Sequence, residues 1–228
     1  LVIDSFYHRD LDLGLPYHLN YGKGMDGYKV GHTAGCGGLV VLADSQLWIG
    51  GPYSRYEILE QTPKQLIFRL SYDSLPVAGI IMQEQITITC TSGQRFNRAD
   101  VILTAPKGIN PPVMMAGGGI YLHDSTDHIF ECQKCGAIAY AEKALSDKGA
   151  IDLNEQRNGG ADQGRAYIGV VTPDAEVIGV TDGSLVSLKT YQCGDTLTYY
   201  FGGAWSNWSD GTESLPTDEE WWQQVRQF

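Results

Sequence analysis

Hydrophobic and polar residues alternate along much of this chain in short runs typical of β-strands. Between residues 65 and 72 every second residue is apolar, namely Leu66, Phe68, Leu70 and Tyr72. Residues 85–90 repeat the pattern. Successive side chains of a strand point to opposite faces, so this alternation predicts strands that are buried on one face. Similar runs predict further short strands at 38–42, 46–49, 56–60, 101–104, 166–171, 186–191 and 197–201.

Turn-forming residues separate these runs. Examples are Thr91-Ser-Gly93, Thr181-Asp-Gly183 and Cys193-Gly-Asp195. Strands that follow one another about ten residues apart are typical of a sandwich or a barrel. Residues 106–119 and 146–165 are rich in Gly, Pro, Asn and Asp, and we expect long loops there. The pattern predicts an all-β, antiparallel β-sandwich that forms a single domain over residues 1–228.

The C-terminus carries the clearest helix signal. Thr217 followed three residues later by Glu220 fits a capping box, in which the two residues satisfy each other's backbone N–H groups. Trp221, Trp222 and Val225 give the following turns an apolar face, so we expect a short helix docked on the sheet. A second, weaker helical pattern covers residues 137–145.

The composition and the net charge argue against some classes of function for this chain. Hydrophobic residues make up 43% and charged residues 19% of the 228, which is the balance of a folded globular protein. A net charge of -11 would repel a nucleic acid, so we expect no such partner. No run of 18 apolar residues predicts a membrane span. The sequence begins at Leu1, which suggests a processed product or a fragment.

Five cysteines leave an odd thiol, and two of them form a C-x-x-C motif at Cys132 and Cys135. The motif lacks a second pair and a surrounding βαβ pattern. Free thiols, a local disulfide and half of a metal site therefore all remain open. Cysteine usage does not fix the cellular compartment.

The segment from residue 4 to residue 38 concentrates groups that bind anions and transfer protons. It holds three of the five histidines, several tyrosines and three basic residues, including His8, Arg9, Tyr17, His18, Tyr28, Lys29 and His32. The hydrophobic residues of this segment recur with neither a helical nor a strand period, so we expect it to be mostly a loop. Tyr and His also occur in cores with one satisfied polar end. The density of titratable groups nevertheless favours a functional site.

Two further places could contribute to a site. His123 and His128 lie close to two aspartates, and together they could hold a divalent metal, the one candidate cofactor. The same residues also suit an ordinary turn. Trp205 lies in an aromatic stretch near the C-terminus, where its ring could stack on a sugar or pack in the core.

The string Tyr17-His18-Leu-Asn-Tyr-Gly-Lys-Gly24-Met-Asp-Gly-Tyr28-Lys29-Val-Gly31, followed by Gly35-Cys36-Gly37-Gly38, resembles the family named domain of unknown function 4861. The ending with Tyr199-Tyr200-Phe201-Gly202-Gly203 and Glu219-Glu220-Trp221 is also similar. Family members occur mainly in Bacteroidota, in gene clusters that degrade polysaccharides. They are typically longer, so the chain resembles their C-terminal portion.

The resemblance implies a galactose-mutarotase-like β-sandwich and a periplasmic or secreted protein whose partner is an oligosaccharide or a polysaccharide. One relative resembles an oligosaccharide dehydratase of ulvan breakdown. We therefore expect a carbon–oxygen lyase that acts on uronic acids by β-elimination, either as a polysaccharide lyase or as a dehydratase. Fold alone does not fix chemistry, so a carbohydrate-binding domain, a sugar epimerase and a glycoside hydrolase remain alternatives.

Elimination at a uronic acid requires three roles. A cation must neutralise the carboxylate beside C5, and Arg9, Lys29 or a metal could do so. A base must remove the C5 proton, for which His18 and His32 are candidates. An acid must protonate the leaving oxygen, which suits Tyr17 or Tyr28. His8 and Trp205 are further candidates for binding the substrate.

Overall fold

The computed structural model describes residues 28, 30–123, 128–144, 164–206 and 217–228 as two antiparallel β-sheets and one C-terminal α-helix. The strands are β1 (Cys36–Ala43), β2 (Gln46–Ile49), β3 (Arg55–Gln61), β4 (Gln65–Val77), β5 (Ile80–Thr91), β6 (Phe96–Thr104), β7 (Met114–Tyr121), β8 (His128–Cys132), β9 (Ala137–Lys143), β10 (Arg165–Val171), β11 (Val177–Thr181), β12 (Ser184–Tyr191) and β13 (Leu197–Trp205). The 3₁₀ turn η2 (Gln133–Cys135) and the helix α2 (Asp218–Gln227) complete them.

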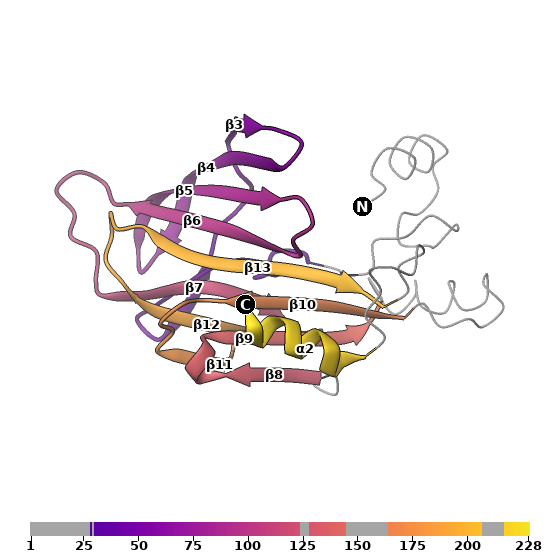
Figure 1. Ribbon diagram of the computed structural model, residues 1–228. Coiled ribbons are helices and arrows are strands. Elements are labelled where there is room, and N and C mark those ends of the chain that lie inside the picture. The colour runs from indigo at the N-terminus through magenta and orange to yellow at the C-terminus, as the bar shows by residue number, and fades with distance from the viewer. Residues whose placement is uncertain (1–27, 29, 124–127, 145–163, 207–216) are drawn as a thin grey trace, which may run out of the picture.

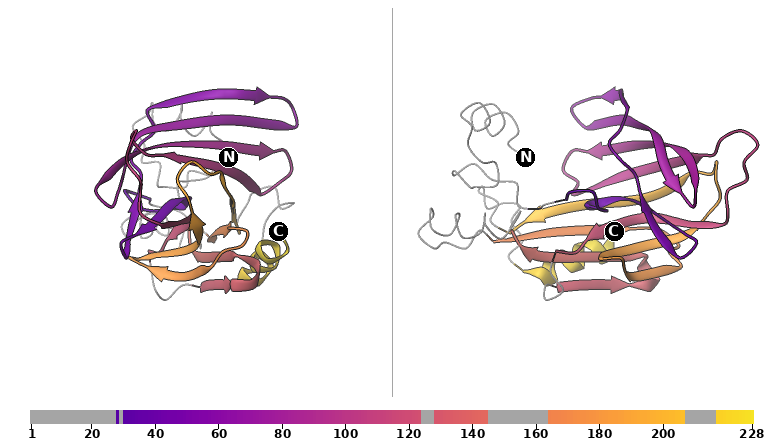
Figure 2. Two further views of the ribbon diagram at one scale, coloured as in Figure 1. Left: turned by 90° about the vertical axis from the view of Figure 1, so that its left-hand side faces the viewer. Right: turned by 180° about the vertical axis from the view of Figure 1, so that it is seen from behind.

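The two sheets form a sandwich. The smaller sheet has the order β11-β12-β7-β1-β2, and the larger has the order β3-β4-β5-β6-β13-β10-β9-β8. The larger sheet twists strongly from β3 to β8, and α2 lies along it beside β9 and β10 (Figure 1). Two further views show the same layers (Figure 2). The expected all-β antiparallel sandwich with a short C-terminal helix is confirmed.

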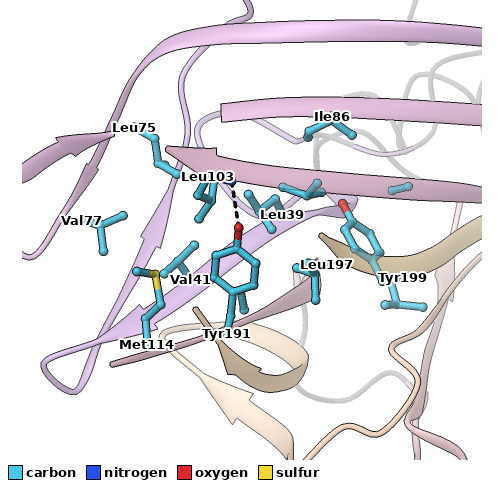
Figure 3. Packing of buried hydrophobic residues seen from close by; sticks show 14 of the residues in the cluster. Leu39, Val41, Leu75, Val77, Ile86, Leu103, Met114, Tyr191, Leu197 and Tyr199 are labelled. Carbon is cyan, nitrogen blue, oxygen red and sulfur yellow. Dashed lines mark hydrogen bonds between the residues drawn. The ribbon is translucent and has the colours of Figure 1, made fainter. Parts of the chain in front are cut away.

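Between the sheets lies the main core, to which most strands contribute. Leu75, Met82, Leu103, Ile138 and Leu185 are among its fully buried side chains. Figure 3 shows part of this packing and the hydrogen bond in which the backbone N–H of Leu103 donates to the Tyr191 hydroxyl at 2.9 Å. Tyr191 donates in turn to the carbonyl of Asp195 at 2.8 Å, so the buried hydroxyl is satisfied on both sides.

All nine predicted strands are present, but the predicted helix at 137–145 is wrong, because residues 137–143 form strand β9. Its side chains alternate between two buried environments. Ile138 and Tyr140 face the core between the sheets, whereas the alanines at 137, 139 and 141 pack with the residues beneath α2. A strand that is buried on both faces has no polar side, and small residues on one face resemble a helix in sequence.

The expected loop at 106–119 is also partly wrong, because β7 begins at Met114 and forms the centre of the smaller sheet. The hydrophobic pattern did not predict this strand because it contains three consecutive glycines, and Gly is depleted in strands. A Cβ atom on Gly117 would lie 1.9 Å from the carbonyl oxygen of Ser187. Glycine is therefore required there by close packing, which is one of the known uses of glycine inside a strand.

The C-terminal helix α2 has the predicted capping box. The backbone N–H of Glu220 donates to Thr217 Oγ1 at 3.2 Å, and the backbone N–H of Thr217 donates to the Glu220 carboxylate, also at 3.2 Å. Trp221, Trp222 and Val225 are buried against the larger sheet. In the described part of the chain, no helix is long and apolar enough to cross a membrane.

Removal of the cap tests this description of the helix start. We expect Thr217→Ala to lower the free energy of unfolding by about 1 kcal/mol, because one backbone N–H at the start of α2 then loses its acceptor. Chemical denaturation measures the change. Thr217→Ser, which keeps the acceptor oxygen, should retain most of the stability, and an equal loss in both variants would contradict the capping role.

The structure decides among the three alternatives for the C-x-x-C cysteines, which were free thiols, a local disulfide and half of a metal site. Cys132 and Cys135 form a disulfide across η2, while Cys36, Cys90 and Cys193 are not disulfide-bonded. The C-x-x-C motif is therefore a local disulfide in this structure and not half of a metal site.

Candidate functional site

Three chemically active side chains meet where β7 and β9 end. His123 follows β7 by two residues, and Glu142 is the penultimate residue of β9. The Nδ1 atom of His123 lies 2.9 Å from a carboxylate oxygen of Glu142. Glu142 is only 1% exposed, whereas the His123 side chain is 24% exposed, so the carboxylate is buried and the imidazole is accessible. The two residues form a carboxylate–imidazole pair.

Tyr28 completes this group, which we name the Tyr28–His123–Glu142 cluster. Its ring packs edge-on against the His123 ring with the centroids 4.5 Å apart. Its hydroxyl donates a hydrogen bond to the backbone carbonyl of Tyr121. Burial raises the pKa of Tyr28 well above its usual range, and nearby Cys36 and Glu142 raise it further. The phenol therefore remains protonated at neutral pH.

The pairing with Glu142 sets the chemistry of His123. A carboxylate that faces Nδ1 holds a proton on that nitrogen, which places the basic lone pair on Nε2. The same contact fixes the ring orientation and stabilises the imidazolium that forms when the ring accepts a proton. The cluster therefore combines an oriented base with a protonated phenol, which are two of the three roles that an elimination requires.

The structure places several residues predicted from sequence, and it brings some of them together. Tyr28, a predicted catalytic residue, lies in the cluster beside His123, which the sequence suggested only as a metal ligand. His32 is exposed in the bend at residues 31–33 and is not among the described contacts of the cluster. The remaining candidates, His8, Arg9, Tyr17, His18 and Lys29, lie outside the described residues.

The two histidines suggested as metal ligands contact different carboxylates. His123 pairs with Glu142, whereas His128 pairs with Asp218 at the start of α2. Asp218 also accepts a hydrogen bond from Arg165 Nε at 2.6 Å. Among the described residues, no group of three or more His, Cys, Asp or Glu side chains could hold a metal ion. The described contacts give the divalent metal no support.

Trp205 lies at the end of β13, on the same face as the cluster. It pairs with Ala166 of β10, which pairs in turn with Glu142 of β9. Directly paired residues point to one face of a sheet, and two strand spacings amount to about 10 Å. Trp205 is partly exposed, so its ring could cover a ligand that contacts the cluster.

A cleft of about 340 Å³ opens on the inner face of the larger sheet, where the segment before β1 and the end of β2 approach β4, β5 and β13. We name it the Glu84 cleft. Its described lining is formed by Val30, Gly31, Thr33, Ala34, Gly35, Cys36, Gly37, Gly38, Leu39, Ile49, Gly50, Gly51, Tyr72, Glu84, Ile86, Ile88, Tyr199 and Phe201. Cys36 connects the two sites, because it lines the cleft and also acts on the ionisation of Tyr28.

Glu84 is the one carboxyl in the described lining, and it is only 3% exposed. Burial raises its pKa from 4.5 to about 7. Tyr72 pairs with Glu84 across β4 and β5, and burial together with the Glu84 charge raises the pKa of Tyr72 to about 12. Burial and the Glu84 charge also raise the pKa of Tyr199. The cleft therefore holds a carboxyl that changes its charge near neutral pH.

The raised pKa of Glu84 predicts a stability that falls as the pH rises. The unfolded chain releases this proton near pH 4.5, while the folded chain keeps it until about pH 7. The free energy of unfolding therefore falls by about 3 kcal/mol in total as the pH rises from below 4.5 to above about 7. We expect Glu84→Gln to gain about this much relative to the unchanged protein between roughly pH 4 and pH 8. Denaturation at both pH values measures it, and equal pH profiles would contradict the burial of this charge.

Sequence reasoning missed Glu84 and Glu142, although one signal marks both. In β5, Glu84 lies midway between Met82 and Ile86, and these three alternate positions are on the strand face that is turned toward the core. In β9, Glu142 follows Ile138 and Tyr140 in the core-facing phase. A carboxyl is almost never fully buried unless its environment compensates for the loss of water. An acidic residue in the apolar phase of a strand is therefore a site signal that can be read from the sequence.

The whole chain, residues 1–228, matches the family model described as "Domain of unknown function (DUF4861)". The sequence is also similar to the uncharacterized protein P7 of Formosa agariphila, with 25% identity over 232 residues. This similarity covers 100% of the chain and 52% of the relative. The chain thus spans about half the length of the curated relative that it matches.

Proposed function

The chain belongs to the DUF4861 family, and from this premise we propose that it is a carbohydrate-active enzyme that acts on uronic-acid-containing oligosaccharides by β-elimination. The observation that carries the proposal is the contact of Tyr28 with a histidine that a buried carboxylate orients. This is an acid beside a base, on an end of the sandwich that Trp205 also reaches.

The roles follow from the geometry of the cluster. His123 removes the proton from C5 of the uronic acid, and the electrons of that bond form the double bond between C4 and C5. The bond between C4 and its oxygen breaks, and the departing oxygen takes the phenolic proton of Tyr28. Glu142 stabilises the imidazolium that results. At the end of the cycle the proton held by His123 returns to the Tyr28 phenolate through solvent.

The substrate carboxylate requires a positive partner, because the charge that develops beside C5 must be neutralised. Arg9 and Lys29 remain the candidates for this role. Lys29 directly follows Tyr28 in the sequence. No metal enters these steps.

Other functions receive less support from the described residues. A glycoside hydrolase with two catalytic carboxyls requires both to face the scissile bond. The described lining of the Glu84 cleft supplies one carboxyl, and the cluster supplies one that is already engaged by His123. A purely binding domain does not require an oriented imidazole beside a half-buried phenol.

We also propose that the protein works in the periplasm or outside the cell. The Cys132–Cys135 disulfide supports this location, since disulfides persist in oxidising compartments and are rare in the cytosol.

Incubation with oligosaccharides that end in a uronic acid tests the proposal. We expect the ultraviolet absorbance of a conjugated, unsaturated uronic acid to rise. Mass spectrometry then separates the two types of elimination: loss of one water identifies a dehydratase, and two fragments of which one is unsaturated identify a lyase. Fragments that have gained water would contradict the proposal and identify a hydrolase. Saturable binding without any product would instead indicate a binding domain.

A further inference from the structure

The Glu84 carboxyl is buried without a described partner. Burial is the one resolved cause of its raised pKa, and no described residue donates a hydrogen bond to it. In the described part of the chain only the Tyr167 hydroxyl is a fully buried side-chain polar atom without a partner, so the Glu84 oxygens are accessible from the cleft, where water or a ligand can donate to them. Because Glu84 lines an open cleft, a ligand can supply the missing donors.

The walls of the cleft favour a flat, partly apolar ligand. Tyr72, Tyr199 and Phe201 contribute aromatic surface, and the rings of Tyr199 and Phe201 lie 6.2 Å apart along β13. In Figure 3 the Tyr199 side chain extends from β13 toward the strand that carries Ile86, another lining residue. A sugar ring has this character, with an apolar face of C–H groups and a rim of hydroxyls.

Two glycines of the lining allow the backbone to approach Phe201 and Glu84 closely. A Cβ atom on Gly37, whose φ is +98°, would lie 2.5 Å from Cβ of Phe201. A Cβ atom on Gly50 would lie 3.3 Å from Oε2 of Glu84 and would crowd the carboxyl. The backbone at these glycines therefore packs closely against Phe201 and beside Glu84, which holds both side chains in the wall of the cleft.

The charge of the cleft selects among sugars. Its described lining contains no Lys, Arg or His. An ionised Glu84 would repel the carboxylate of a uronic acid, whereas neutral hydroxyls can donate to it. The volume of about 340 Å³ is at the small end of the range for small-molecule sites, about 300–1,000 Å³, and suits a single sugar unit.

From these observations we propose that the Glu84 cleft is a binding site for one neutral sugar unit, whose hydroxyls donate hydrogen bonds to Glu84 and whose apolar face packs on the aromatic wall. The site differs in residues and in charge preference from the Tyr28–His123–Glu142 cluster. Its existence does not depend on elimination, because binding at Glu84 requires no turnover.

Ionisation of Glu84 then controls the affinity. The described titratable groups that act on it are Tyr72 of β4 and Tyr199 of β13, and Cys36 of β1 lines the same cleft. Burial raises the pKa of both tyrosines above the neutral range, so Glu84 is the group that titrates near pH 7. Hydrogen bonds to a charged acceptor are about twice as strong as neutral ones. Affinity for a neutral sugar should therefore increase from about pH 6 to about pH 8.

Calorimetric titration of the full chain with D-glucose, D-galactose, D-mannose and D-xylose tests the proposal, with D-glucuronate as the anionic counterpart. We expect at least one neutral sugar to bind saturably, and glucuronate to bind more weakly at about pH 8. Glu84→Gln should weaken neutral-sugar binding by about tenfold or more, which is about 1.4 kcal/mol, and should remove its dependence on pH.

A matched control is Glu57→Gln, because Glu57 is exposed on β3, contacts Arg69 at 3.7 Å and does not line the cleft. Its affinity for the neutral sugar should be unchanged. Equal affinities of the Glu84→Gln variant and the unchanged protein would overturn the proposal, as would the absence of saturable binding by all four neutral sugars. Neither outcome would affect the elimination assay, which uses a different substrate group and a different readout.

Discussion

Replacement of His123 by alanine is expected to lower the rate of elimination by about 10²- to 10⁴-fold, the usual contribution of a positioned general base. Nε2 of His123 is the proposed proton acceptor, and Glu142 cannot replace it because it is buried behind the ring. The substrate would still be bound by other groups, so kcat should fall while KM changes little. Steady-state kinetics on an oligosaccharide that ends in a uronic acid measures both.

Companion variants separate this role from others. Tyr28→Phe removes the proposed acid and should also lower kcat, whereas Tyr56→Phe alters an exposed tyrosine of β3 and should not. His128→Gln addresses the metal prediction, since a site that used both histidines would lose activity in both variants. A His123→Ala protein that folds and retains its full rate would contradict the assignment of the base.

Replacement of Trp221 by alanine is expected to cost about 3–5 kcal/mol of unfolding free energy, the usual cost of removing a large buried aromatic side chain. Trp221 is 0% exposed and stacks on Phe96 with ring centroids 5.5 Å apart. Its Nε1–H donates to the carbonyl of Ile168 at 3.0 Å. The variant therefore loses apolar burial and a buried hydrogen bond at the joint between α2 and the sheet.

Denaturation with urea measures this loss, and Trp221→Phe is the matched variant. Phenylalanine keeps most of the apolar area but not the donor, so it should cost less than alanine, although one carbonyl loses its partner. A Trp221→Ala protein as stable as the unchanged chain would mean that α2 does not hold the sheet as described.

The hydrophobic pattern of the sequence predicted nine of the thirteen described strands and did not predict β7, β8, β9 and β11. The pattern failed for β9 because neither face of this strand is polar. Its alanines pack under α2, and Ile138 and Tyr140 face the main core. It also failed for β7, where glycines such as Gly117 fit against a neighbouring backbone. Both errors arise from packing between layers, which a local pattern does not contain.

The candidate site was predicted in part. The sequence marked Tyr28 as catalytic and His123 as a metal ligand, but it did not join them, since 95 positions separate the two residues and only the pairing of sheets and loops brings their rings together. Glu142 and Glu84 were overlooked because acidic residues are common and their burial is a tertiary property. Their position in the apolar phase of β9 and β5 was nevertheless readable.

The Tyr28–His123–Glu142 cluster and the Glu84 cleft differ in the surroundings of their carboxyl groups and in the chemistry that these allow. At the Tyr28–His123–Glu142 cluster a carboxylate accepts a hydrogen bond from the imidazole beside it, which suits proton transfer. In the Glu84 cleft a carboxyl lacks such a partner among the described residues and faces an aromatic wall, which suits binding. An oligosaccharide with both neutral and acidic units has a chemical match for each place.

The most direct test of the central claim follows the substrate by proton NMR while the unchanged protein and the His123→Ala variant act on an oligosaccharide that ends in a uronic acid. The account predicts that the C5 proton signal disappears and that a vinylic proton on C4 appears at the same rate, with both changes strongly slowed in the variant. A substrate spectrum that stays unchanged in the presence of the folded, unchanged protein would contradict it, as would a vinylic signal that forms equally fast without His123.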